Sequence, residues 1–593
     1  MGSTVQGYGG SQLHCEAGQI VIRLPRQVFG EAWVDLRTRL LEAMGQQQVI
    51  FSPQRTMTER GEGDEAPRWK STGFDVLSWV LFLLKVPVEH ELVALWQTIP
   101  WTTVNQLCAP LYRNAHGGRH AWAPAQMVAI LMLMFLYGVA YETRTLAWVK
   151  ENVVWCWFCG LGLFGPWPNR NALYDFRQRV GPELFEEVLT LAVWACVEAG
   201  LVSNLLVSFD LSSVVASGHR WSPYERAVIL TKALIRYLEL CWIEQRPEEP
   251  MPETLRKLAA EVALEVLPHK ALKRVKPERV VESVGQWDDQ SDAQEPPWQE
   301  VVKGTVEAVH LEEKPIEDSL LEVTAEAVRP KLVRVANKLM VRLPHTRGDL
   351  DARVGRTTDC TWFCGYLIGF VVDSLCHIIT AVVLVAGNAK QFKLFPPAVD
   401  AHRQRLGAPK AVAIDSAFDI PDIHTYLDRH HIEGHVTSRD HVTPVDGGYG
   451  TDRLEWDEEC WILRCPNQTP LKPKGKTWQG KQTYVGTACH ECRRYKDCRP
   501  NGQGEPKQFT LNPVTHRRWQ ENRKHCLTEE YKAAQERRFV EEGRFGLAKM
   551  NHHGAKAPYR SEDMNLIAAL MMAIVMNYRI LAQHLQQERS ATN

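Results

Sequence analysis

Residues 204–216 read NLLVSFDLSSVVA, and this stretch decides how the rest of the chain is interpreted. Its apolar first half predicts a buried strand, and the polar DLSS that follows predicts a turn. Asp210 would then stand at the end of that strand. A second stretch, AVAIDSAF at 411–418, repeats the pattern and places Asp415 after an apolar strand. The carboxyl ends of buried strands open onto a crevice where ligands bind, so both aspartates are candidate site residues. Taken alone, either would more often be a turn residue or a helix cap.

The sequence around these strands alternates between strand and helix patterns. Strands are predicted at CGYLIGFVVD (364–373), HIITAVVLVAG (377–387) and GHVTSR (434–439), and helices near 390–405 and 420–429. An antiparallel pair followed by strands that alternate with helices is typical of a mixed sheet. We therefore predict an α/β fold with a mixed sheet flanked by helices.

The part of the chain before residue 200 has a mainly helical pattern. From about 72 onward, Leu, Val, Met and Trp recur at three- and four-residue spacing, the periodicity of helices with a buried face. The longest strongly apolar run, Met127 to Ala140, is shorter than the ~20 residues that cross a bilayer. We interpret it as a buried helix and predict no membrane segment. The first residues lack the features of a signal peptide, so a reduced, cytoplasmic setting is expected.

The overall composition is that of a globular protein, because 45% of the 593 residues are hydrophobic and 23% are charged. This excludes a mostly disordered, collagen-like or coiled-coil chain. The formal net charge of −1 is a cancellation between two segments. Residues 244–330 hold 11 Lys and Arg against 20 Asp and Glu, which indicates an acidic helical insertion. Residues 464–560 hold 21 Lys and Arg against 9 Asp and Glu, a surplus that can neutralise nucleic-acid phosphates.

A third candidate carboxylate lies in RRFVEEGRFGLAK, residues 537–549, which has a helical pattern. Arg538 precedes Glu542 by four residues and Lys549 follows it by seven, so the three can share one helical face. Glu541 is the alternative acid at this site. A ladder of surface ion pairs would give the same charge pattern, and that interpretation stays open.

Carboxylates that converge in a cleft can bind a pair of Mg²⁺ ions about 4 Å apart, which stabilise the attacking and leaving oxygens of a phosphodiester. Phosphoryl transfer of this kind needs mainly positioning and charge from the protein. Asp210, Asp415 and Glu542 are therefore predicted to bind Mg²⁺ or Mn²⁺. Arg538 and Lys549 are predicted to hold the flanking DNA phosphates.

Taken in order, these segments resemble a bacterial insertion-sequence transposase of the DDE class. The resemblance is carried by VSFDLSSVVA, GYLIGFVVDS, HIITAVVLVAGNAKQF, AVAIDSAFDIPDIHTYL and RRFVEEGRFGLAKM, which contain all three acids. The last segment is similar to the family's arginine–glutamate–lysine signature, which falls on Arg538, Glu542 and Lys549. Upstream, the stretch from APAQMVAILMLMFLYGVA to PNRNALYDFRQRV resembles the helical N-terminal domain of these transposases.

The resemblance implies a ribonuclease-H-like catalytic core and a helical domain that recognises the terminal inverted repeats. Arg170 and Arg177, with Arg144 and Arg179 near them, are the implied DNA-binding residues of the helical domain; a packing domain with exposed arginines is the alternative. We expect an N-terminal segment and linker at 1–70, a helical DNA-binding domain at 71–200 and a catalytic domain at 201–593. The catalytic domain is expected to contain two insertions, an acidic helical one at 219–345 and a basic, cysteine-bearing one at 440–530.

Two features depart from the family pattern. The signature often has a tyrosine three residues before the arginine, where this chain has Gln535, and Tyr531 lies one turn earlier. In addition, 205 residues separate Asp210 from Asp415, and the acidic insertion accounts for this long interval.

The basic segment also contains a candidate zinc site. Cys489, Cys492 and Cys498 form a C-x₂-C-x₅-C pattern, and Cys465 lies upstream. Two thiolates on a tight turn can reach one ion, and four cysteines would complete a tetrahedral Zn²⁺ site. An iron–sulfur cluster and free thiols are the alternatives. The reserve ligands are Cys460 and His490.

The expected function is Mg²⁺-dependent cleavage at insertion-sequence ends, followed by transfer of the freed 3′ end into target DNA. The expected partner is double-stranded DNA, both terminal repeats and target, with a homodimer or larger assembly on DNA. A bacterial, cytoplasmic, nucleoid-associated location is expected. The alternatives are a domesticated transposase that binds DNA without catalysis, and a hydrolytic nuclease of the same fold.

Overall fold

The computed structural model of the chain describes residues 76–592 with short gaps, and before residue 76 only four strands. The gaps fall at 113–119, 219, 268, 290–296, 314–324, 358–360, 440–447, 458–459, 478–479 and 553. The early strands are β1 (Val5–Gln6), β2 (Gln12–Glu16), β3 (Gln19–Leu24) and β4 (Val49–Pro53), which form one small sheet. The predicted linker after residue 53 lies outside the described residues.

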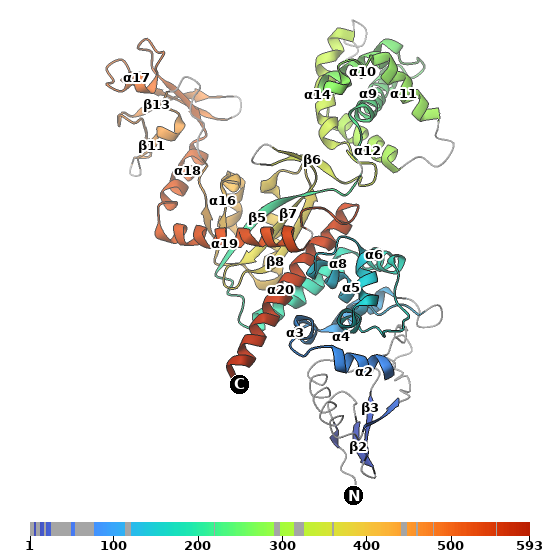
Figure 1. The fold of residues 1–593 in the computed structure, drawn as a ribbon. Coiled ribbons are helices and arrows are strands. Elements are labelled where there is room, and N and C mark those ends of the chain that lie inside the picture. Colours follow the sequence, from blue (N-terminus) through green and yellow to red (C-terminus); the bar gives the residue numbers. More distant parts are fainter. Residues whose placement is uncertain are drawn as a thin grey trace.

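The centre of the molecule is a curled, six-stranded mixed sheet (Figure 1). Its strands are β5 (Leu206–Val215), β6 (Arg353–Arg356), β7 (Trp362–Asp373), β8 (Ile378–Ala386), β9 (Ala411–Ile414) and β10 (Glu433–Val436). The order runs β10-β9-β5-β7, and β7 also pairs with both β6 and β8. β5 pairs antiparallel with β7 and parallel with β9, and β9 pairs parallel with β10. The predicted mixed α/β sheet is thereby confirmed.

One strand is longer than the sequence predicts. The prediction that β5 ends at Asp210 in a polar turn is wrong, because the strand continues to Val215. Ser212 and Ser213 pair with Ile368 and Leu367 of β7, so the polar DLSS segment forms sheet hydrogen bonds instead of a turn. The length of β7, which is apolar and buried almost throughout, provides the partner that holds these serines in the sheet.

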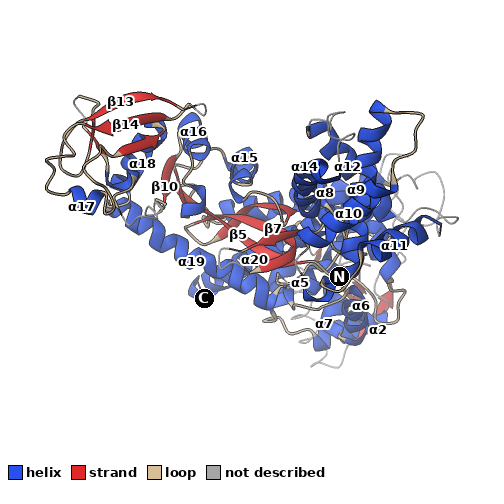
Figure 2. Cartoon of the chain, turned by 90° about the horizontal axis from the view of Figure 1, so that it is seen from above, coloured by secondary structure: helices blue, strands red, loops and turns tan. Residues whose placement is uncertain are grey.

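The two faces of the sheet are covered by different helices, as the view from above shows (Figure 2). Alternation along the strands sends Val207 and Phe209 of β5, and Val412 and Ile414 of β9, toward α15 (Phe395–Leu406) and α16 (Pro421–Arg429). The opposite face of β7 and β8 packs against α19 (Glu529–Asn551) and α20 (Glu562–Thr592). The long helix α19 crosses the sheet (Figure 1).

The helical pattern predicted before residue 200 is confirmed. The helices are α2 (Val76–Lys85), α3 (Glu91–Thr98), α4 (Trp101–Cys108), α5 (Pro124–Leu136), α6 (Glu142–Glu151), α7 (Val153–Phe158) and α8 (Arg170–Glu198). These helices share one continuous hydrophobic core with α20 and the adjoining face of the sheet. The run that begins at Met127 lies in α5 and is buried, as predicted.

Helix α20 is long and apolar enough to cross a membrane by length and composition. The most apolar part of this helix is 83% buried inside the protein, and the helix packs against α8 and β8. One mostly buried helix of this kind is typical of a protein core and is not sufficient to indicate a membrane segment.

Two further units lie outside the central sheet (Figure 1). Between β5 and β6 in sequence, a set of helices packs around a hydrophobic core of its own. These helices are α9 (Pro223–Gln245), α10 (Glu253–Val266), α11 (Pro277–Asp289), α12 (Pro297–Glu312) and α14 (Ala325–Arg342). Between β10 and α19 in sequence, a small unit has a separate hydrophobic core. It contains β11 (Glu455–Trp456), β12 (Leu463–Arg464), β13 (Leu471–Lys476), β14 (Gln482–Gly486), α17 (Tyr495–Cys498) and β15 (Gln508–Leu511). Helix α18 (Pro513–His525) follows this unit.

Candidate active site

Continued two residues past its last pair, the register of the parallel strands β5 and β9 would bring Asp210 beside Asp415. In the β5–β9 ladder, Leu206 pairs with Ala411 and Ser208 with Ala413, an offset of 205 residues at each pair. The ladder ends at this pair, and the same offset carried two residues further would match Asp210 with Asp415. Neighbouring strands lie about 4.8 Å apart, and paired residues point to the same face. The 205-residue interval in the sequence is therefore the spacing that aligns the two aspartates.

The shared face of the two aspartates is the one that α19 covers. Leu206, Ala411 and Ala413 pack against Ala534 of α19 in one small cluster. Asp210 is an even number of residues from Leu206, and Asp415 is an even number from Ala411, so alternation puts both carboxylates on this face. Asp415 directly follows β9, and its Oδ1 accepts the backbone N–H of Ala417 at 2.9 Å. Its predicted position at a strand end is confirmed.

Contacts at two points determine where α19 crosses the sheet. Near the start of the helix, the Gln535 side-chain amide donates to the carbonyl oxygen of Ile414 at 3.3 Å and of His435 at 2.7 Å. Further along, the Phe545 ring stacks on Phe370 with 4.5 Å between ring centroids. Phe370 is the residue of β7 that pairs directly with Asp210. The helix therefore passes from β9 and β10 at residue 535 to β7 at residue 545.

The spacing along the helix places residue 542 over β5. Ten residues of α-helix span about 15 Å, which matches the three strand spacings of about 4.8 Å from β10 to β7. Three residues of helix therefore correspond to one strand. Counted back three to four residues from Phe545 above β7, the part of α19 at residues 541–542 lies near β5, the strand that carries Asp210. The side chains of Glu541 and Glu542 are outside the described part of the structure.

The two edges of α19 face different ends of the strands, and this distinguishes the two glutamates. Ala534 packs against Leu206 and Ala411, at the beginnings of β5 and β9, and against Ala413. Gln535 reaches the carbonyl of Ile414, at the carboxyl end of β9. Seven residues are close to two helical turns, so Glu541 follows the edge of Ala534 and Glu542 follows the edge of Gln535. Residue 542 therefore shares the helical edge of Gln535, which is the edge nearer the carboxyl end of β9.

The far end of α19 is held against the N-terminal helices. The Nδ1 atom of His552 lies 2.7 Å from the carbonyl oxygen of Phe135 at the end of α5. Gly138 has φ +59°, and a Cβ atom there would come 2.7 Å from the carbonyl oxygen of Asn551. Glycine is needed at this position because of both the backbone conformation and the close approach. The helix is thus fixed at both ends.

The basic residues of the predicted signature lie at different depths. Arg538 is only 7% exposed, and its Nε donates to the Gln535 Oε1 at 2.9 Å. Lys549 is exposed. Gln535 occupies the position where the family often has tyrosine, and its amide connects Arg538 to the sheet. Tyr531, one turn earlier, donates its hydroxyl to the Thr437 Oγ1 at 3.0 Å.

Arg439 is a cation near the candidate site that the sequence analysis missed. Its Nε donates to the carbonyl oxygen of Ser416 at 2.7 Å, so the guanidinium lies beside the turn that follows Asp415. It also lines a cavity of about 460 Å³ between α16 and the small unit. Lys481, Arg518 and Trp519 line the same cavity, together with Asp419.

Of the arginines predicted to bind DNA in the helical part, only some are exposed. Arg177 is 4% exposed, forms an ion pair with Glu142, and lies 4.1 Å from the centroid of the Tyr559 ring. Burial lowers the pKa of Arg177. The prediction that Arg177 contacts DNA is wrong for this conformation, because its charge is used inside the core. The exposed arginines of this group are Arg144, Arg170 and Arg179.

The four cysteines of the candidate zinc site meet around one small cavity. Cys465, Cys489, Cys492 and Cys498 line a space of about 30 Å³ in the small unit. Burial raises the pKa of the Cys498 thiol, and the other three cysteines add to this shift. A Cβ atom on Gly486 would come 2.3 Å from the Cys489 sulfur, so a larger residue there would displace this side chain. No three of these sulfurs lie within 4.8 Å of one another. The reserve ligands Cys460 and His490 do not line the cavity.

Two parts of the chain match known protein families. Residues 82–179 match the family described as Transposase domain (DUF772), and residues 464–582 match the one described as Transposase DDE domain. The second match contains α19 and most of α20. The chain is also 32% identical over 114 residues to the "Uncharacterized protein ORF8 in nfe locus" of Rhizobium meliloti. That match covers 19% of this chain and 54% of the relative, so the chain spans about half of that protein's length.

No solved structure matches the chain. The two family matches follow the same order as the structural parts, with the helical region first and the α19–α20 region last. A transposase domain and a DDE transposase domain on one polypeptide support its assignment as an insertion-sequence DDE transposase.

Proposed function

We propose that this protein cleaves DNA at the ends of an insertion sequence and transfers the freed 3′ ends into target DNA. The observation that carries the proposal is the 205-residue offset of the β5–β9 ladder, on the face crossed by α19, which if continued by two residues would align Asp210 with Asp415. The strand order β8-β7-β5-β9-β10, with three antiparallel and then two parallel strands, supports a ribonuclease-H-like core.

The donor set of the site fits a hard divalent cation. Asp210 and Asp415 offer carboxylate oxygens about one strand spacing apart, and Glu542 on the crossing helix would add a third carboxylate. Oxygen ligands of this kind suit Mg²⁺ or Mn²⁺. A bound divalent ion would neutralise charge on the phosphodiester and lower the pKa of an attacking water or 3′-hydroxyl.

The surrounding residues would hold the DNA in line for this chemistry. Arg538 faces the sheet beside β9, where it would offset the negative charge of the carboxylates and of an approaching phosphate. Lys549 and Arg439 are exposed and would contact the flanking DNA backbone. The basic segment, with the cavity that Lys481 and Arg518 line, would extend the DNA path toward the small unit.

The helical region would bind the terminal repeats, with Arg170 at the start of α8 as an exposed candidate. Two ends must be joined in one reaction, so we expect a homodimer or larger assembly on DNA. The α9–α14 unit and the small unit, each with its own core, support the two predicted insertions in the catalytic domain. We expect the protein to act in the bacterial cytoplasm on nucleoid DNA.

An assay with labelled DNA carrying the inverted repeats that flank the gene tests this proposal. With Mg²⁺ or Mn²⁺ and a target plasmid, we expect nicking at the repeat boundary followed by joined products. Nicking without joining would instead indicate that the protein is a hydrolytic nuclease of the same fold. Specific end binding with no metal-dependent nicking would assign a non-catalytic DNA-binding protein.

We also propose that Cys465, Cys489, Cys492 and Cys498 bind structural Zn²⁺. The shared cavity supports this assignment, although the sulfurs would have to move closer to reach the ~2.3 Å bonds of a zinc–thiolate site. Zinc would then tie the loop after β14 to β12 and α17.

Replacing Cys489 with Ser should remove one equivalent of zinc from the purified protein and make β13–β15 more susceptible to proteolysis. Zinc analysis and limited proteolysis measure these effects, with the exposed Cys460→Ser variant as the matched control. Equal zinc content in Cys489→Ser and Cys460→Ser would contradict the assignment.

A further inference from the structure

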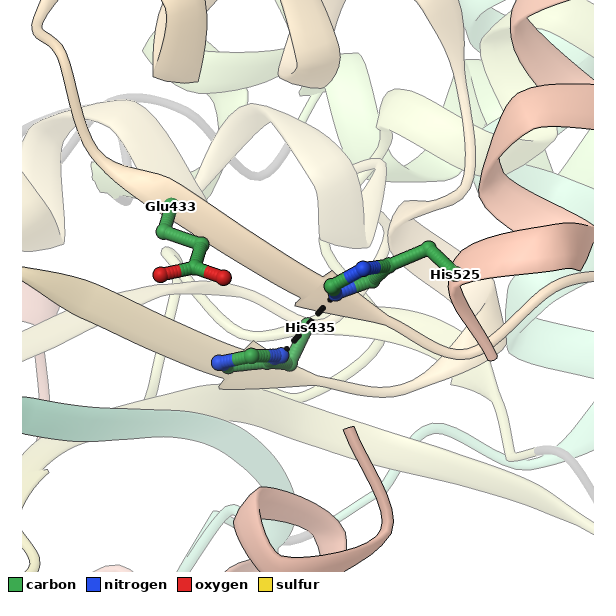
Figure 3. A group of neighbouring side chains, drawn as sticks. All are labelled: Glu433, His435 and His525. Carbon is green, nitrogen blue, oxygen red and sulfur yellow. Dashed lines mark hydrogen bonds between the residues drawn. The ribbon is translucent and has the colours of Figure 1, made fainter. Parts of the chain in front are cut away.

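Three side chains with metal-binding chemistry meet at the edge of the central sheet. They are Glu433 and His435 of β10 and His525, the last residue of α18 (Figure 3). One ligand atom from each lies within 4.8 Å of the other two. In the part of the chain that the structure describes, this is the one group of three or more His, Cys, Asp and Glu side chains with such spacing.

The fold brings these residues together from both sides. Glu433 and His435 are two residues apart in an edge strand, so their side chains point to the same face. A Cβ atom on Gly434, between them, would come 2.7 Å from the Leu427 side chain, which fixes the strand against α16. His525 is held at the corner between α18 and α19, where the Thr528 hydroxyl donates to its carbonyl oxygen at 2.8 Å.

The distances between the ligand atoms suit a transition-metal ion. The Nδ1 of His435 lies 3.0 Å from the Nε2 of His525, and one of the two donates a hydrogen bond to the other. Two nitrogens bound to tetrahedral zinc at 2.0–2.1 Å are separated by about 3.3 Å, so an ion could replace the shared proton with little movement. Glu433 is exposed and leaves the cluster open to solvent on one side.

Burial at the base of the cluster favours the ligand form of the imidazole. His435 is 5% exposed, and its burial lowers the pKa of its imidazole. The neighbouring His525 also lowers this pKa, whereas the charge of Glu433 raises it. Neutral imidazole is the form that coordinates metals.

We propose that Glu433, His435 and His525 bind one divalent transition-metal ion such as zinc. Two imidazoles and one carboxylate favour zinc, cobalt or nickel over magnesium, which prefers oxygen ligands only. The ion would join β10 to the α18–α19 corner and so fix the start of the helix that carries Glu542. The backbone carbonyl of His435 already accepts a hydrogen bond from Gln535 of α19, which places the site next to that helix.

The site is separate from the aspartate pair. His435 pairs with Ala413, two residues before Asp415 on the neighbouring strand. Two residues along and one strand across correspond to about 8 Å between Cα atoms, and neither aspartate belongs to the group whose ligand atoms lie within 4.8 Å of one another. The inference does not depend on the proposed transposase activity.

Cobalt binding to the full chain tests the site. An Asp210→Asn, Asp415→Asn background removes the candidate catalytic metal site, and Co²⁺ is added to the metal-free protein. Cobalt at the cysteines has thiolate charge-transfer absorption, and cobalt at a nitrogen–oxygen site has only the weaker visible bands. We expect the His525→Ala variant to bind one equivalent less of the cobalt that has the weaker visible bands of a nitrogen–oxygen site. The exposed Glu433→Gln should lower its affinity about tenfold or more.

His584→Ala, at a histidine near the end of α20 that lies outside the cluster, is the matched control and should bind as much cobalt as the background protein. The proposal is overturned if His525→Ala and Glu433→Gln both bind cobalt like His584→Ala. It is also overturned if the equivalent lost in His525→Ala has thiolate absorption. Glu433→Gln removes only an exposed carboxylate, so its result does not depend on whether His525→Ala folds.

Discussion

Replacing Asp415 with Asn should reduce metal-dependent cleavage of insertion-sequence ends by about 10³-fold or more. The substitution keeps the size of the side chain and its ability to accept the Ala417 N–H, but removes one of the two aligned charges. Losing a charged ligand weakens the stabilisation of charge that develops on the phosphodiester. Cleavage is measured with labelled end DNA in Mg²⁺ and in Mn²⁺, and end binding is measured separately by fluorescence anisotropy.

The control for this variant is Asp422→Asn, an exposed aspartate in the first turn of α16. Its cleavage rate should stay within about twofold of the unmodified protein, because surface substitutions away from special features change little. End binding should be nearly unchanged in both variants. Loss of binding in Asp415→Asn with cleavage retained would refute the role assigned to this residue.

The second large effect concerns the two neighbouring glutamates of α19. Glu542→Gln should abolish cleavage to the same extent as Asp415→Asn, whereas Glu541→Gln should stay within a few-fold of the unmodified protein. The reason is the helical spacing: residue 542 shares the edge of Gln535, which contacts the carboxyl end of β9, and residue 541 shares the edge of Ala534, which packs at the strand beginnings.

The pair of variants serves as its own matched control, because the two residues are adjacent and the substitutions are identical. Both proteins should unfold at the same temperature, which shows that the helix is intact. If Glu541→Gln is the inactive variant, the third carboxylate is Glu541 and the helical-edge argument is wrong. If both variants cleave normally, α19 contributes no ligand.

Much of the central sheet could be predicted from the sequence, because buried strands are apolar and their ends are polar. The positions of β7, β8, β9 and β10 followed from this contrast. The same reasoning failed for β5, where polar Ser212 and Ser213 stay in the strand because the long β7 continues beside them. Strand pairing over long distances in the sequence decides such cases, and a local pattern does not contain it.

The candidate site could be predicted only in part. The three acids were identified from their positions after strands and in a helix, but their alignment depends on the register between β5 and β9. The burial of Arg177 depends on Tyr559 and Glu142, which lie far from it in the sequence. For the same reason, no local pattern pointed to the group formed by His435 and His525, which are 90 residues apart.

The position of bound Mn²⁺ tests the central claim most directly. Crystals of the full chain with Mn²⁺, measured for anomalous scattering, should show an ion within coordination distance of Asp210 and Asp415, with the Glu542 carboxylate turned toward it. An ion at the strand ends would account for the register, the helix crossing and the expected activity together. Strong Mn²⁺ signal elsewhere in the protein and none between the two aspartates would contradict the account.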